Sequence, residues 1–285
     1  MNRLSGEELD TRLRGFLSED IGGIDITTET TVPLGLRAEG ELLAKSPCIV
    51  SGLSVARRTF ELLDARLVWT SQREPGDRAE GGDVLVRLSG QAHAILMAER
   101  VALNLLQRMS GIATSTRRFV EAVQGTAASI FDTRKTAPGL RPFDRIAVVD
   151  GGGMNHRGSL AEMVLIKDNH RRLAGGVALA LRAARDRVPA GVLIEVEVET
   201  EEELSEVAAA GADIILIDNQ RPETVARWAE IARVLRPELS IEASGGIRLE
   251  NVRAYAEAGA NRISVGALTH SVEAADISLE LVRGG

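Results

Sequence analysis

The sequence is poor in several residue types, and each shortage excludes a class of protein. Cys48 is the single cysteine, so no disulfide can form within the chain, which fits a reducing cytoplasm. Aromatic residues make up only 3% of the sequence, which argues against base-stacking surfaces for nucleic acid. No apolar run approaches the ~18 residues of a membrane-spanning helix, and no apolar stretch near the N-terminus precedes a signal-cleavage site. We therefore expect a cytoplasmic protein.

Positive charge is also in short supply, since 34 basic residues face 41 acidic ones and the net charge is −7. Proteins that bind nucleic acid or a membrane surface usually show a basic face, so we expect neither partner. The apolar fraction of 44% is sufficient for an ordinary core, and 285 residues suit one large or two ordinary domains. Local clusters of cations are informative against this acidic background.

The first part of the chain, residues 1–112, reads as an N-terminal α/β domain. Short strand-like runs near 37–44 and 83–88 are separated by turns rich in glycine and acidic residues. A helix is predicted from about Ala92 to Met109, because apolar residues recur there at steps of three and four. Arg100 falls on the side of this helix opposite the apolar stripe, so a second surface packs or binds there.

From about residue 113 to 270, strand-like and helix-like segments alternate, which predicts βαβ units and a parallel sheet. The predicted strands are 129–132, 146–149, 163–167, 192–198, 214–218, 240–243 and 262–265. Ile194-Glu195 and Ile241-Glu242 each begin a similar strand–helix–glycine–strand unit, at an offset of 47 to 48 residues. We interpret this repeat as the duplicated unit of an α/β barrel.

Charged residues and glycines follow the ends of these predicted strands. A parallel barrel gathers the carboxyl ends of its strands at one face, where they form one site. The cations Arg134, Arg157 and Lys167, with His156, suit planar carboxylates. Glu197 and Asp218 could hold a hard divalent cation such as Mg²⁺, and Gly245, Gly246 and Gly266 fall where barrels commonly bind phosphate.

Ordinary structural roles explain other polar residues equally well. Glu195, Glu197 and Glu199 alternate along one strand and share a face, so Glu197 can act at the site while its neighbours form salt bridges. Cys48 has no nearby histidine and is interpreted as a packed residue.

Motifs along nearly the whole chain resemble the quinolinate phosphoribosyltransferase family. They include Glu99-Arg100 with Ala102-Leu103-Asn104, the segment Asp132 to Arg141, and Asn155-His156-Arg157. They continue with Leu165-Ile166-Lys167-Asp168-Asn169-His170, Glu195-Val196-Glu197-Val198, Ser244-Gly245-Gly246-Ile247 and Ser264-Val265-Gly266-Ala267. Each motif alone is weak, but their order and spacing together are specific.

The resemblance implies an α/β fold with an N-terminal α/β sandwich domain, 1–112, and a C-terminal seven-stranded open, TIM-like α/β barrel, 113–270. Residues 271–285 are expected to pack with the first domain. The implied reaction joins quinolinate to phosphoribosyl pyrophosphate with Mg²⁺ and releases nicotinate mononucleotide, pyrophosphate and carbon dioxide. A homodimer is implied, with Arg100 reaching into the partner's site, and further association of dimers is left open.

The resemblance also assigns roles to individual residues. The implied catalytic residues are Lys135, Lys167, Glu197 and Asp218, with Glu197 and Asp218 supporting the magnesium. The implied substrate-binding residues are Arg100, Thr133, Arg134, His156, Arg157, Lys167, Ser244, Gly245, Gly246 and Gly266.

Three alternatives remain at this point. Lys167 at a barrel strand end could form a Schiff base, as in an aldolase. The barrel could bind a phosphosugar without catalysis. A related group linked to molybdenum transport shares much of the fold, although we expect it to lack the intact stretch Lys167-Asp168-Asn169-His170.

Overall fold

The computed structural model describes residues 6–283, with side chains to residue 282, and divides into two compact units. The first unit contains Met1–Arg117, Ala137–Gly152 and Val272–Gly285, and the second contains Arg118–Thr136 and Gly153–Ser271. None of the helices in the described range is long and apolar enough to cross a membrane.

The first unit is built on an antiparallel sheet with strand order β12-β1-β5-β3. These strands are β12 (Ile277–Arg283), β1 (Arg37–Ala44), β5 (Val84–Gln91) and β3 (Val68–Ser71). Residues of β1 alternate between exposed and buried, which is the pattern of a sheet with one face on the core. The C-terminal segment, which we expected to pack here, contributes β12 as the neighbour of β1. A short ladder joins β2 (Cys48–Ile49) to β4 (Arg78–Ala79).

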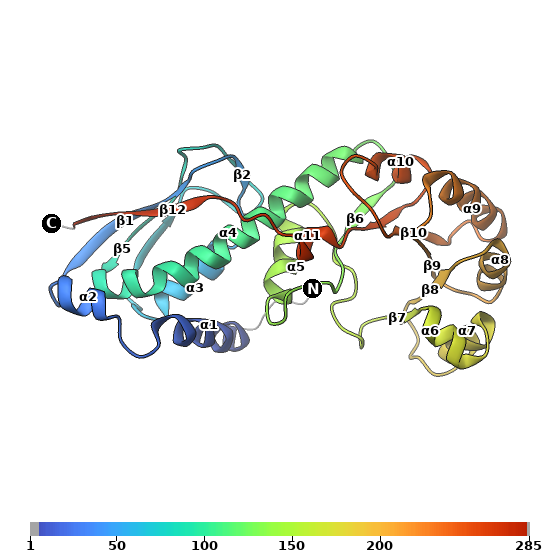
Figure 1. Ribbon diagram of the computed structural model, residues 1–285, viewed down its shortest axis with the longest axis horizontal. Coiled ribbons are helices and arrows are strands. Elements are labelled where there is room, and N and C mark those ends of the chain that lie inside the picture. Colours follow the sequence, from blue (N-terminus) through green and yellow to red (C-terminus); the bar gives the residue numbers. More distant parts are fainter. Residues whose placement is uncertain (1–5, 284–285) are drawn as a thin grey trace. The chain divides into compact units, whose positions relative to one another are not determined.

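Helices supply the other layer of the first unit (Figure 1). They are α1 (Gly6–Ile21), α2 (Ile26–Thr31), α3 (Leu53–Glu61), α4 (Ala92–Ala122) and α5 (Arg141–Asp150). The core includes Phe60 on α3, Leu85 on β5 and Ile95 and Leu106 on α4, all fully buried. These side chains form one apolar cluster with the inner face of the sheet.

Helix α4 runs 13 residues beyond the end at Met109 that the sequence predicted. Gly111, which follows the predicted end, lies inside the helix. A Cβ at position 111 would lie only 3.0 Å from the Cα of Ala274, with the carbonyl oxygen of Glu273 nearer still. The glycine is therefore needed for close backbone approach and does not end the helix.

The predicted strand 146–149 is wrong, because these residues belong to helix α5. Pro142 stands in its first turn, where proline favours a helix start. Phe143, Asp144, Ala147 and Val148 are buried, so burial recurs every four residues and not every two. By its contacts α5 groups with the first unit, although our boundary at residue 113 had assigned it to the barrel domain.

The second unit contains a six-stranded parallel sheet with strand order β6-β11-β10-β9-β8-β7. The strands are β6 (Ser129–Phe131), β7 (Val164–Ile166), β8 (Ile194–Val198), β9 (Ile214–Asp218), β10 (Ser240–Ser244) and β11 (Arg262–Ser264). Six of the seven predicted strands are therefore present. An isolated parallel bridge from Met154 to Phe131 adds a seventh position beside β6.

The sheet must curl into an open barrel, because side chains from distant strand positions meet. His156 follows the bridge at Met154, while Glu195 lies on β8, five positions away. Neighbouring strands are about 4.8 Å apart, so these positions would be roughly 24 Å apart in a flat sheet. The Nε2 atom of His156 lies 3.0 Å from Oε2 of Glu195, which requires the strands to wrap around a common interior.

Helices cover the outer side of these strands (Figure 1). They are α6 (Asp168–Ala174), α7 (Val177–Arg185), α8 (Glu201–Ala209), α9 (Pro222–Leu235), α10 (Val252–Glu257) and α11 (Ala267–His270). The side chain of Thr200 accepts a hydrogen bond from the Glu203 amide at 3.2 Å, which caps the N-terminus of α8. The βα alternation brings all strand ends to one edge of the barrel.

Candidate active site

The predicted site residues of the second unit all lie at or near the carboxyl ends of its strands. Thr133, Arg134 and Lys135 follow β6, and His156 and Arg157 follow the bridge at Met154. Lys167 directly follows β7, Glu197 lies in β8, and Asp218 ends β9. Ser244 ends β10 and is followed by Gly245 and Gly246, while Gly266 follows β11. Arg100 is the exception, since it is exposed on α4 in the first unit.

Two guanidinium groups lie near each other on the side of the site that follows β6. Arg134 is exposed, and Arg157 is half-buried with its Nη1 donating to the Met163 carbonyl at 2.9 Å. Burial lowers the pKa of Arg157, and the positive charge of Arg134 lowers it further. Such repulsion between two cations is relieved by a bound anion, so this corner suits a carboxylate.

Lys167 and Glu197 form an ion pair between neighbouring strands. The Nζ atom of Lys167 lies 2.6 Å from Oε2 of Glu197, whose residue is only 7% exposed. Lys167 stands at the cap of α6, where its amide donates to Nδ1 of His170 at 3.0 Å. The backbone therefore fixes where the ammonium group enters the site.

Asp218 lies beside the glycine loop that follows β10. Asp218 and Ser244 are register partners, and Nδ2 of Asn219 donates to Oδ2 of Asp218 at 2.6 Å. The amide of Asn219 also donates to the Ser244 carbonyl at 2.9 Å. Asn219 has a φ of +54°, a backbone conformation that asparagine tolerates better than most residues. The contacts join a carboxylate to a loop with accessible backbone.

Lys135 passes close to the chain after β11. A Cβ at Gly266 would lie 3.2 Å from Cδ of Lys135, so the absence of a side chain leaves room for the lysine stem. The carbonyl of Lys135 accepts a hydrogen bond from Oγ1 of Thr269 at 2.9 Å. The hydrogen bond between Thr269 and Lys135 joins the loop after β6 to the segment after β11.

A buried polar group lies below the cations, inside the barrel. Its members are His156, Glu195 on β8 and Glu242 on β10, whose ligand-type atoms lie within 4.8 Å of one another. Burial alone would lower the pKa of His156, but the two carboxylates raise it above its usual range. Burial raises the pKa of Glu195, whereas for Glu242 burial is outweighed by His156, Arg262 and Ser264, which lower the pKa.

The same three residues could in principle ligate a metal, but their surroundings disfavour one. The Nε atom of Arg262 lies 2.7 Å from Oε2 of Glu242, so a guanidinium already supplies positive charge. Adding a divalent ion would place two cations on one buried carboxylate. Glu197 and Asp218 stay the predicted supports for Mg²⁺, which takes one or two protein carboxylates and fills its shell with water and phosphate oxygens. Glu197 already pairs with Lys167, so it would support the ion only through water.

Sequence reasoning missed the part played by Glu195, Glu242 and Arg262. The signal was present, since Glu195 and Glu242 occupy equivalent places in the duplicated unit. A repeat that puts an acid on two strands of one barrel interior predicts a basic partner for both. His156 is that partner in the structure.

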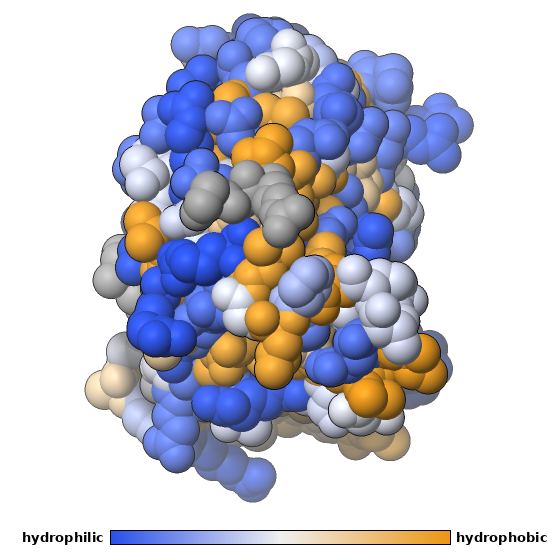
Figure 2. All heavy atoms as spheres, turned by 90° about the vertical axis from the view of Figure 1, so that its left-hand side faces the viewer, coloured by the Kyte–Doolittle hydropathy of each residue, from blue (hydrophilic) through white to orange (hydrophobic). Residues whose placement is uncertain are grey.

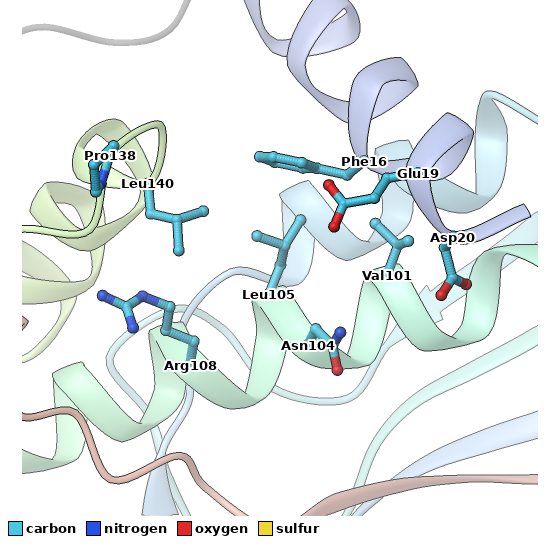
Figure 3. Close-up of a pocket in the computed structure, with 9 residues that line it drawn as sticks. All are labelled: Phe16, Glu19, Asp20, Val101, Asn104, Leu105, Arg108, Pro138 and Leu140. Atoms are coloured by element: carbon cyan, nitrogen blue, oxygen red, sulfur yellow. The ribbon is translucent and has the colours of Figure 1, made fainter. Parts of the chain in front are cut away.

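The first unit holds a separate cavity of about 570 Å³. Figure 3 shows Asn104, Leu105 and Arg108 of α4 on one side and Phe16 and Glu19 of α1 on the other. Arg100 stands one helical turn before Asn104 and two before Arg108, so all three share a face of α4. Arg100 and Asn104 on this face are exposed, whereas Arg108 is partly buried and pairs with Asp144 of α5.

Family models account for almost the entire chain. The N-terminal domain of quinolinate phosphoribosyl transferase matches residues 25–110, and the C-terminal domain matches residues 112–280. The chain belongs to the quinolinate phosphoribosyltransferase family. The resemblance read from the sequence motifs is thereby confirmed.

Individual relatives agree with this assignment over nearly their full length. A probable nicotinate-nucleotide pyrophosphorylase (carboxylating) of Bacillus subtilis is 43% identical over 282 residues, which cover 99% of this chain and 95% of the relative. The Mycobacterium leprae nicotinate-nucleotide pyrophosphorylase (carboxylating) is 42% identical over 275 residues, covering 94% and 95%.

Solved structures show the same fold. NadC from Streptococcus pyogenes superposes with a TM-score of 0.93 at 36% identity and covers 100% of both chains. The nicotinate-nucleotide pyrophosphorylase from Francisella tularensis gives a TM-score of 0.92 at 33% identity, covering 99% of this chain and 98% of that one. The predicted two-part α/β architecture is confirmed.

Proposed function

We propose that this enzyme transfers the phosphoribosyl group of phosphoribosyl pyrophosphate to quinolinate and removes one carboxylate, as in de novo NAD biosynthesis. The products are nicotinate mononucleotide, pyrophosphate and carbon dioxide. The observation that carries the proposal is the pair of adjacent cations, Arg134 and Arg157, at the strand ends of a barrel from this family.

The diacid binds on the side of Arg134, Arg157 and Lys167, with Thr133 and His156 belonging to the same wall. Quinolinate carries two neighbouring carboxylates, and a guanidinium binds such groups with two parallel hydrogen bonds while keeping its charge at working pH. Arg157 and Lys167 are half-buried, which strengthens their attraction for an anion.

The sugar donor binds on the side formed by Lys135, the loop Ser244-Gly245-Gly246 and Gly266. Gly246 is exposed and a Cβ there would meet nothing within 4 Å, so this backbone is open to a phosphate. Glu197 and Asp218 would hold Mg²⁺ through water, and the ion would neutralise the pyrophosphate.

The chemistry needs no nucleophile from the protein. The quinolinate nitrogen forms a bond to C1 of the sugar while the bond from C1 to the pyrophosphate oxygen breaks. The nitrogen is then cationic, and the bond to the adjacent carboxylate breaks with its electron pair moving to the ring, which takes a proton as carbon dioxide leaves. The protein's residues align the reactants and stabilise the charge that develops.

A homodimer completes the proposed site, with Arg100 donated by the partner. The exposed position of Arg100 on α4 supports this. The first unit also exposes large apolar side chains, including Ile26 and Leu34. Figure 2 shows an apolar band bordered by hydrophilic residues on one face. Such surfaces mark protein interfaces. We also propose a cytoplasmic location, which the free thiol of Cys48 supports.

The Schiff-base alternative is disfavoured by the environment of Lys167. Its Nζ atom lies 2.6 Å from Oε2 of Glu197, so the lysine is engaged in an ion pair. An amine that forms a Schiff base must instead be free to attack the substrate carbonyl.

The direct test mixes the purified chain with quinolinate, phosphoribosyl pyrophosphate and Mg²⁺. We expect nicotinate mononucleotide and carbon dioxide in equal amounts. Nicotinate, which lacks one carboxylate, serves as the control substrate and should react poorly. Equal turnover of both acids would contradict the diacid site.

A further inference from the structure

His156 uses its backbone and both ring nitrogens in contacts within the protein. Its amide donates to Oδ1 of Asp132 at 2.6 Å. The ring Nε2 lies 3.0 Å from Oε2 of Glu195 and 3.3 Å from Oε1 of Glu242. The other ring nitrogen, Nδ1, accepts a hydrogen bond from the amide of Arg157 at 2.8 Å. A ring held in this way is poorly placed to bind a substrate carboxylate itself.

The ring orientation follows from these contacts. Turning the imidazole over would exchange its nitrogens for carbons, so the carboxylates and the amide would both lose their partner. The carboxylates favour a hydrogen on Nε2. The Arg157 amide can donate to Nδ1 only while that nitrogen is bare, so this contact belongs to the neutral ring and works against the rise in the pKa of His156 that the carboxylates cause. Both preferences are met by one placement of the ring.

The two carboxylates are themselves held to different degrees. Oε1 of Glu242 accepts from Oγ of Ser264 at 2.5 Å, and its Oε2 faces Nε of Arg262 at 2.7 Å. Arg262 is fixed in turn, since its guanidinium carbon lies 3.8 Å from the centre of the Phe131 ring. Glu195 is 0% exposed, and within residues 6–282 neither of its oxygens accepts a well-formed hydrogen bond. His156 is therefore its main compensation.

A fully buried carboxylate with so little support lowers the stability of the fold. Its presence therefore calls for a functional explanation. Across the described residues, Glu195 forms one ion pair, with His156, which directly precedes the half-buried Arg157 of the diacid wall. The chain of contacts runs from Glu195 through the imidazole to the Arg157 amide.

We propose that Glu195 and Glu242 are positioning residues for the diacid site, which hold the His156 ring so that it fixes the backbone and direction of Arg157. Their effect on the substrate is indirect and passes through His156. This inference rests on the proposed function, because Arg157 is taken as a ligand of quinolinate. It explains why Glu195 and Glu242 are buried in the barrel although neither contacts the substrate.

The test is the Glu195→Gln variant, which keeps the shape of the side chain and removes its charge. We expect the KM for quinolinate to rise about tenfold, while kcat and the KM for phosphoribosyl pyrophosphate stay within about twofold. Glu199→Gln is the matched control, because Glu199 lies four residues beyond Glu195 and pairs with Arg171 at 3.0 Å, outside the His156 contacts. It should leave all three constants unchanged.

A uniform fall in kcat with both KM values unchanged would overturn the proposal, because loss of packing alone has that effect. Equal effects of Glu195→Gln and Glu199→Gln would also overturn it. If Glu195→Gln does not fold, Ser264→Ala replaces it, since it removes one support of Glu242 at no change in charge. The KM for quinolinate should then rise about twofold to threefold, and an unchanged value contradicts the proposal.

A crystal structure of Glu195→Gln separates this inference from the proposed function. We expect the distance between Nδ1 of His156 and the Arg157 nitrogen to open beyond 3.5 Å. An unmoved ring refutes positioning even in an active enzyme. A moved ring in a chain that makes no nicotinate mononucleotide would refute the reaction and leave the positioning intact.

Discussion

Gly245 shows how one residue shapes the phosphate side of the site. Its φ is +86°, and a Cβ there would lie 2.8 Å from the backbone nitrogen of Asn219, with the Asn219 side chain nearer still. Any side chain would push apart the loops after β9 and β10, which carry Asp218 and Ser244. The position needs glycine for both its conformation and its space.

We predict that Gly245→Ala lowers kcat/KM for phosphoribosyl pyrophosphate by at least about a hundredfold, because displaced loops misplace the donor. Steady-state kinetics at saturating quinolinate measures this. Gly211→Ala is the control, since Gly211 has a φ of +90° but a Cβ there would meet nothing within 4 Å. It should cost stability with little change in kinetics, and equal kinetic losses would contradict the explanation.

The places of the candidate site residues in the fold were largely predictable, because strand ends are predictable. A cation or glycine directly after a strand-like run, as at Lys167 or Gly245, faces the site in any parallel barrel. Glu195 and Glu242 could not be assigned in this way. Their role depends on which side chains meet across the barrel interior. No local sequence pattern shows which residues of distant strands come into contact.

At the scale of elements, α5 is tied to α4 by a buried ion pair. Nε and Nη2 of Arg108 donate to the two oxygens of Asp144 at 2.8 and 2.9 Å, and Asp144 is fully buried. Burial raises the pKa of Asp144 although Arg108 opposes the rise. The carboxylate therefore depends on this arginine.

We predict that Arg108→Ala lowers the free energy of unfolding by about 3–5 kcal/mol, because it leaves a buried charge without this partner. Urea denaturation followed by circular dichroism measures the loss. The difference in the free energy of unfolding between variant and wild type should become smaller as the pH falls toward 4, since protonation of Asp144 removes the unpaired charge.

Arg58→Ala provides the control for this experiment. Arg58 makes the same two-bond contact to Asp10, at 2.7 and 2.6 Å, but both side chains are partly exposed. Water can replace that pair, so we expect a much smaller loss. A comparable loss in both variants would show that burial is not the cause.

The same helix explains the main error of the sequence interpretation. The run Ile146-Ala147-Val148-Val149 is rich in β-formers, and short apolar runs do not distinguish a strand from a buried helix. The decisive contacts of α5, from Arg108 and from Phe16 to Phe143, involve residues far away in the sequence. The strands β9 and β11 were predictable, because each follows a glycine at the same place in the duplicated unit.

For the whole molecule, the proposed dimer makes a test by mixing possible. Arg100→Ala and Lys167→Ala should each be nearly inactive alone. If Arg100 acts in the partner's site, a mixed dimer has one intact site, so refolding equal amounts together should restore about a quarter of the wild-type activity. No recovery, measured as nicotinate mononucleotide formed, would place Arg100 in its own chain's site or outside any site.

The central claim is that cations at the barrel's strand ends bind a pyridine diacid. Its most direct test is kcat/KM for quinolinate in Arg134→Ala, at saturating phosphoribosyl pyrophosphate and Mg²⁺, beside the exposed control Arg182→Ala on α7. We predict a loss of about a hundredfold or more for Arg134→Ala and none for Arg182→Ala. An unchanged kcat/KM in Arg134→Ala would contradict the account.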